Sequence, residues 1–140
     1  MFQLAIRSLL IAGLLTAAGA HAAGRTSAPE GAKVYIVSPK DGDTVAQTFT
    51  VHFGLSGMGV APAGVDRPAT GHHHLLVDMD ELPPLDQPMS ADIKHFGGGQ
   101  TEAELTLPPG KHTLQLLLGD MNHVPHDPPV LSDKITIIVE

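Results

Sequence analysis

The sequence predicts an all-β fold, an antiparallel immunoglobulin-like β-sandwich of about six to eight strands. Short runs of apolar and β-branched residues recur along the chain, with glycine and proline between them. No segment sustains the period of about 3.6 residues that marks an amphipathic helix. The 15 glycines and 12 prolines among 140 residues indicate many turns and little helix.

Six segments have the pattern of strands. In Thr48 to Phe53 apolar and polar residues alternate, so that Phe49, Val51 and Phe53 share one face. The same alternation recurs near the C-terminus, where Ile135 and its second neighbours point inward. The predicted strands are 34–37, 48–53, 71–79, 101–107, 112–118 and 134–139, and the long loops are 54–70, 83–99 and 119–129.

The first 22 residues have the pattern of a cleavable signal peptide. Arg7 is their only charge, an apolar run extends from Leu9 to Leu15, and Ala20-His21-Ala22 resembles a cleavage site. That run is shorter than the roughly 20 residues that cross a bilayer, and no later segment is apolar enough to span one. We therefore expect a periplasmic or secreted protein with a signal peptide at 1–22, a flexible linker at 23–33 and a β-sandwich domain at 34–140.

Composition narrows the possible functions. The formal charge is −7, and cleavage would remove Arg7 and make it −8, which disfavours nucleic acid and anionic lipid as partners. The absence of cysteine excludes a blue-copper centre, whose thiolate ligand cannot be built. The sequence also lacks a G-x-S-x-G motif, and its dense carboxylates, such as Asp78 and Asp80, show no spacing that selects an acid and a base.

Histidine carries the main chemical signal. Eight of the nine histidines follow the predicted signal peptide, and five lie in two short segments, 72–74 and 123–126. In a strand, residues i and i+2 project from one face, so His72 and His74 can converge, whereas His73 points toward the core. His123 and His126 lie in a proline-stiffened loop, where a three-residue step can also chelate a metal.

These histidines predict a metal site. The four side chains of His72, His74, His123 and His126 would supply the nitrogens, a ligand set that suits copper first and zinc second. His95 precedes a glycine-rich loop that can bring it in as an additional ligand. Met58 and Met121 adjoin the histidine segments, and a thioether would favour Cu(I). Each of these residues also has a simpler role open to it, as a hydrogen-bonded turn residue, a solvated side chain or a core filler.

Several distinctive strings resemble a known family. They are Val34 to Gly42, Phe53 to Gly64, Gly71 to Leu76, His112 to Asp120 and Asn122 to Val130. All of them are similar to the DUF4399 family, and the resemblance covers roughly residues 34 to 139. It implies one compact domain in a bacterial envelope protein, and it implies no catalytic residue.

Three functions remain open at this stage. The first is a histidine-rich module that binds copper or zinc for buffering, sensing or delivery rather than turnover. The second is an immunoglobulin-like scaffold whose partner is another envelope protein. The third is a metal-dependent hydrolase, which needs three ligands, an open water position and a general base. Whether the imidazoles at 72, 74, 95, 123 and 126 converge in one ligand sphere separates them.

Overall fold

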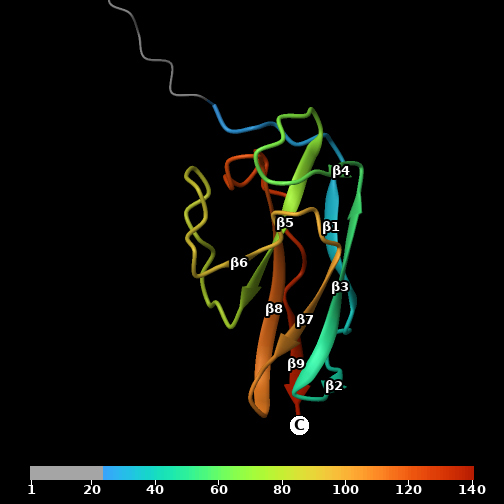
Figure 1. Cartoon of the computed structure of the whole chain (residues 1–140). Coiled ribbons are helices and arrows are strands. Elements are labelled where there is room, and N and C mark those ends of the chain that lie inside the picture. Colours follow the sequence, from blue (N-terminus) through green and yellow to red (C-terminus); the bar gives the residue numbers. More distant parts are fainter. Residues whose placement is uncertain (1–23) are drawn as a thin grey trace, which may run out of the picture.

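The computed structural model describes residues 24–140, so the predicted signal peptide lies outside the described residues. Figure 1 shows that the described part is built of strands and loops, with no helix among these residues. The strands are β1 (Lys33–Ser38), β2 (Thr44–Val45), β3 (Thr48–Ser56), β4 (Gly59–Val60), β5 (Thr70–Val77), β6 (Lys94–His95), β7 (Glu102–Thr106), β8 (Gly110–Gly119) and β9 (Ile135–Val139).

The strands form two sheets. The first has the order β1-β3-β7, and the second has the order β2-β9-β8-β5-β4, with β6 paired to β5. The long strands pair in antiparallel fashion, whereas the two-residue strands β2 and β4 run parallel to β9 and β5. The all-β sandwich expected from the sequence is confirmed, and these two parallel pairings are additions to it.

The main hydrophobic core fills the space between the sheets. The alternation in β3 places Val51 and Phe53 inward, where they are 0% and 6% exposed. From the second sheet, the alternate residues of β8 meet them, together with Leu75 of β5. The buried members of this core are Val34, Val51, Phe53, Leu75, Leu105, Leu114, Leu116, Leu118, Val130, Ile137 and Val139.

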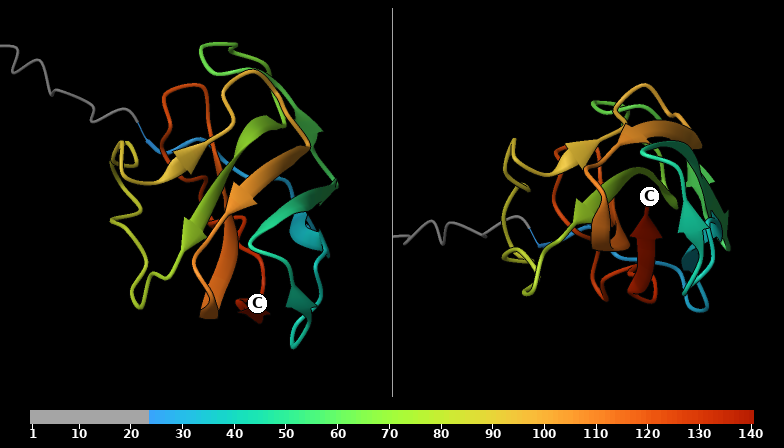
Figure 2. Two further views of the ribbon diagram at one scale, coloured as in Figure 1. Left: turned by 60° about the horizontal axis from the view of Figure 1, so that its bottom comes forward. Right: turned by 90° about the horizontal axis from the view of Figure 1, so that it is seen from below.

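The outer face of the second sheet is also buried. The segment between β5 and β6 lies on the side of this sheet away from β1 and β3, as the views of Figure 2 show. Met89 and Ile93 of this segment pack against Leu76 of β5 and Leu117 of β8 in a second apolar cluster. Residues of β5 that point away from the main core are therefore also shielded from water.

Two of the expected loops contain short strands. The segment 54–70 begins with the end of β3 and includes β4, and the segment 83–99 includes β6. Neither two-residue strand has enough alternation to be recognised in a sequence. β6 matters for the site because it pairs His95 with His74 across the sheet edge.

The N-terminal arm, residues 24–32, lies against the loop between β8 and β9. Arg25 donates hydrogen bonds to the carbonyls of Pro125 and His126, and the Thr26 hydroxyl donates to Asp120 Oδ2 at 2.7 Å. Two backbone hydrogen bonds join the arm to Asp127. The linker expected at 23–33 thus contacts the domain along its described residues, and its flexibility stays a prediction.

Across residues 24–140, the structure contains no helix with the length and hydropathy needed to cross a membrane.

Candidate metal centre

β5 brings His72 and His74 to the outer face of the second sheet. Their side chains point the same way because they are two residues apart in a strand, as the sequence predicts. Their ring centroids lie 4.6 Å apart, and the residues are only 0% and 1% exposed. Two imidazoles are thus held side by side beneath the loops that cover this face.

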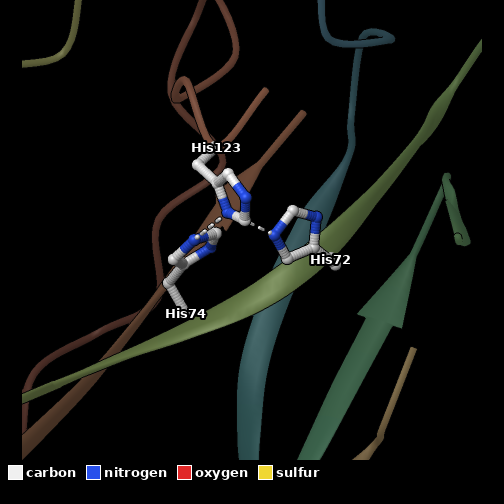
Figure 3. Close-up of side chains that lie close together, drawn as sticks. All are labelled: His72, His74 and His123. Carbon is white, nitrogen blue, oxygen red and sulfur yellow. Dashed lines mark hydrogen bonds between the residues drawn. The ribbon is translucent and has the colours of Figure 1, made fainter. Parts of the chain in front are cut away.

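His123, from the loop between β8 and β9, completes a group of three. Its Nδ1 lies 3.0 Å from Nε2 of His72 and 3.4 Å from Nε2 of His74. Figure 3 shows the ring of His123 over the other two, with this nitrogen facing both. One nitrogen from each ring lies within 4.8 Å of the others, so the three can hold one metal ion.

The backbone at His123 adopts an uncommon conformation. Its φ is 65°, in the left-handed region that few non-glycine residues enter. Asp120 stabilises the turn, because its Oδ1 accepts the backbone N–H groups of Asn122 and Val124 at 2.9 and 3.0 Å. The carbonyl of His123 also accepts the N–H of Met89 at 2.9 Å. These contacts fix the direction in which the third imidazole points.

Two glycines give the imidazoles their space. Gly119 lies opposite His72 in the register of β5 and β8. A Cβ on Gly119 would lie 2.5 Å from Cε1 of His74, and one on Gly71 would lie 2.8 Å from Cε1 of His126. Both distances are far below van der Waals contact, so any side chain at these positions would displace a ring.

Burial keeps the paired histidines neutral. Desolvation, with the nearby imidazoles of His123 and His95, lowers the pKa of His72 from 6.5 to about 4. Desolvation, with His72 and His123, lowers the pKa of His74 to about 3. Both side chains are therefore unprotonated at neutral pH, which is the form that binds a metal.

His95 lies beside the group of three on β6. Its ring centroid is 5.1 Å from that of His123, 6.0 Å from that of His74 and 6.4 Å from that of His72. It is exposed, and it borders a hollow of about 220 Å³ that opens onto the site. The hollow is lined by His74, Met89, Ser90, Ala91, Ile93, His95 and His123.

The structure does not bring His126 into this group. Its Nε2 lies 3.2 Å from the carbonyl oxygen of Thr70, and its fully buried ring packs against Gly71. A three-residue step from His123 in this loop turns the side chain toward the start of β5 rather than toward His72 and His74. His126 therefore has the role of a loop histidine that hydrogen-bonds the backbone, the simpler of the two expected from the sequence.

The other histidines lie elsewhere. His73 points into the main core, as the sequence predicts, and its ring centroid is 5.1 Å from that of Phe53. His52 is exposed, with Nδ1 2.8 Å from the Ser38 hydroxyl. His112 Nδ1 lies 2.7 Å from Asp78 Oδ2, and the hydrogen bonds to Asp78 and to the Pro108 carbonyl raise the pKa of His112.

Three further residues at the site were missed by sequence reasoning. Asp120 and Gly119 shape the site without being ligands, and their chain neighbours give no pattern that reveals it. Met89 borders the hollow, whereas Met58 packs against the main core and Met121 is not among the residues of the hollow. The nearest histidine in the sequence is His95, six residues later, and no local pattern connects Met89 to the other histidines of the site.

The arrangement offers three imidazole nitrogens to one ion. Metal–nitrogen bonds of about 2.0–2.1 Å in a tetrahedral site place ligand nitrogens about 3.3 Å apart. The 3.0 and 3.4 Å separations from His123 Nδ1 match that spacing. Imidazole nitrogen suits zinc and copper, and the hollow leaves a side open for a fourth ligand.

Fold and site together define an all-β sandwich with a cluster of three histidines, two buried and one half-buried, on the outer face of one sheet. The family model described as "Domain of unknown function (DUF4399)" matches residues 51–140. The chain therefore belongs to the DUF4399 family, as its sequence strings indicated.

No curated protein matches the chain. Among solved structures, the chain is similar to the fibronectin(III)-like modules of Clostridium thermocellum CbhA, with a TM-score of 0.42 and 12% sequence identity. The match covers 77% of this chain and 45% of that chain, so this chain spans less than half the length of that structure.

Proposed function

We propose that this protein is a transition-metal-binding module of the bacterial envelope, with His72, His74 and His123 as its ligands. Copper is the first candidate ion and zinc the second. His95, at the mouth of the hollow, is placed to supply a fourth nitrogen. The module buffers, senses or delivers the ion rather than turning over a substrate.

The convergence of three imidazole nitrogens, two of them from buried histidines, is the observation that carries the proposal. Two imidazole nitrogens form a hydrogen bond only when one carries a proton and the other does not, whereas a metal ion accepts lone pairs from all three. No carboxylate within residues 24–140 belongs to the group that could hold the ion. Buried polar groups are costly without partners, and an ion gives these imidazoles one.

The proposed role in storing or transferring an ion follows from the ligand atoms and from the predicted periplasmic location. A metal-dependent hydrolase needs a base beside the metal, and the described group contains imidazoles alone. The predicted signal peptide directs the protein to the periplasm, where a cysteine-free site avoids disulfide chemistry. Both points favour storage or transfer of an ion.

Isothermal titration of the tag-free protein with Cu²⁺ and Zn²⁺ tests the proposal. We expect one ion per chain and a Kd below about 10 μM, near 7 kcal/mol of binding free energy. Replacement of His112 by alanine is the matched control, because this histidine is remote from the cluster and binds Asp78. Binding of neither ion at that strength would exclude the metal function and favour the scaffold function.

A further inference from the structure

Met89 is the one methionine at the hollow beside the cluster within the part of the chain that the structure describes. It borders this space together with His74, His95 and His123. A Cβ built on Gly119 would lie 2.9 Å from His74 Nδ1 and 3.0 Å from Met89 Cε. The terminal methyl group of Met89 therefore lies near the Nδ1 side of the His74 ring, and the sulfur is the next atom back along the side chain.

The backbone ties Met89 to the third histidine. Its N–H donates to the His123 carbonyl at 2.9 Å, so the loop that carries Met89 and the loop that carries His123 are joined at the site. Met89 is 8% exposed, which keeps its thioether away from bulk water. His72 is not among the residues that border the hollow. Met89 therefore borders the site on the side of His74 and His123.

We propose that the Met89 thioether is a ligand of the ion held by His72, His74 and His123, and that the site therefore selects Cu(I). This inference rests on the proposed function and names its ion. Thioether sulfur is a soft donor that prefers Cu(I), whereas Zn²⁺ in proteins is held by thiolate, imidazole and carboxylate. The site has imidazole nitrogen and thioether sulfur and no thiolate, because the chain contains no cysteine.

A packing role for Met89 is the competing explanation. Its side chain contacts Leu76, Ile93 and Leu117 in the outer apolar cluster, and methionine commonly fills such gaps. Leucine conserves most of the volume of methionine and removes the sulfur, so M89L separates ligation from packing. Met121 offers the matched control, because M121L changes a half-buried methionine that does not border the hollow.

The experiment measures Cu(I) affinity without oxygen, in competition with a Cu(I)-selective chelator, and Zn²⁺ affinity by titration. We expect the Cu(I) affinity of M89L to be ten-fold or more below that of wild type. Even substitutions of residues that only contact metal ligands lower metal affinity by about 10–100-fold. Zn²⁺ affinity of M89L and both affinities of M121L should stay within about three-fold of wild type. X-ray absorption of the Cu(I)-loaded wild type should show one sulfur neighbour beside nitrogen.

The outcomes separate the two proposals. Cu(I) binding by the wild type with no sulfur neighbour, or with unchanged affinity in M89L, overturns the Met89 assignment and leaves the three-histidine site standing. Failure of the wild type to bind either copper or zinc overturns both. If M89L does not fold, the sulfur signal of the wild type alone decides the assignment.

Discussion

Histidines near the two ends of β5 lie in opposite surroundings. Near its first end, His72 and His74 are buried, and their Nε2 atoms face only another imidazole, that of His123. Just beyond its last residue, Asp78 binds His112, whose second nitrogen faces the Pro108 carbonyl. The second arrangement is complete with protein partners alone, because a protonated imidazole has an oxygen at each nitrogen. In the first, the group of three within residues 24–140 consists of imidazoles alone, which is the arrangement that a cation completes.

The largest effect should come from removing the third imidazole of the cluster. H123N keeps a residue type that tolerates the positive φ at this position and removes the ligand nitrogen. We expect copper and zinc affinity to fall by more than about 100-fold, beyond the range of outer-shell substitutions. Titration calorimetry measures it. Replacing His112 with alanine should leave both affinities unchanged, and equal losses in the two variants would contradict the comparison.

Gly119→Ala should disturb the cluster by size alone. The new Cβ would meet the His74 ring at 2.5 Å and must push it aside. We expect a loss of about 1–3 kcal/mol in unfolding free energy, typical of an overfilled core, and a clear fall in metal affinity. Urea unfolding and calorimetry measure the two effects. Gly24→Ala is the control, because a Cβ there has no atom within 4 Å, and matching behaviour of the two variants would refute the space argument.

The two ends of β5 should respond to pH with opposite sign. Below pH 6.5, His72 and His74 take up protons in the unfolded chain but not yet in the folded protein, where their pKa values are about 4 and about 3. The unfolding free energy of metal-free protein should therefore decrease from about pH 6.5 toward pH 4. His112 has a raised pKa, so it stabilises the fold below pH 6.5 and loses that effect as pH rises through the raised value.

Two variants separate these contributions in urea unfolding with a chelator present. The double variant H72L with H74L should flatten the acid loss of stability, because it removes the groups that resist protonation. The variant H112A should lower stability at acidic pH and have little effect at alkaline pH. An acid loss that persists unchanged in the double variant would show that other groups cause it.

The smallest effect should come from the turn that presents His123. D120N removes the negative charge of the side chain that accepts hydrogen bonds from the Thr26 hydroxyl and from two N–H groups of the turn. We expect a stability loss of about 1 kcal/mol and a fall in metal affinity of about ten-fold at most. D66N, at an exposed carboxylate, is the control in the same measurements. If D120N and D66N had equal metal affinity, Asp120 would have no role in positioning His123.

Local patterns predicted much of this molecule. Alternation in Thr48 to Phe53 identified β3, and the two-residue spacing of His72 and His74 placed their rings on one face. The same rule sent His73 into the core beside Phe53. These predictions succeed because strand geometry decides them within a few residues.

The sequence predicted that the two histidine segments meet, but it could not decide which loop residues reach the site. Nothing in the local sequence distinguishes His123, which joins the cluster, from His126, which binds the Thr70 carbonyl. The choice depends on a left-handed residue and on the contacts of Asp120. Met89 was passed over in favour of Met58 and Met121, since its approach to His74 arises only when the 78–93 segment folds over the sheet.

A crystal structure of the protein loaded with one equivalent of copper, with anomalous scattering at the copper edge, tests the central claim most directly. The account predicts one strong anomalous peak bonded to Nε2 of His72, Nε2 of His74 and Nδ1 of His123, at about 2.0–2.1 Å from each. A peak at His112 and Asp78 instead, or no peak near β5, would contradict it.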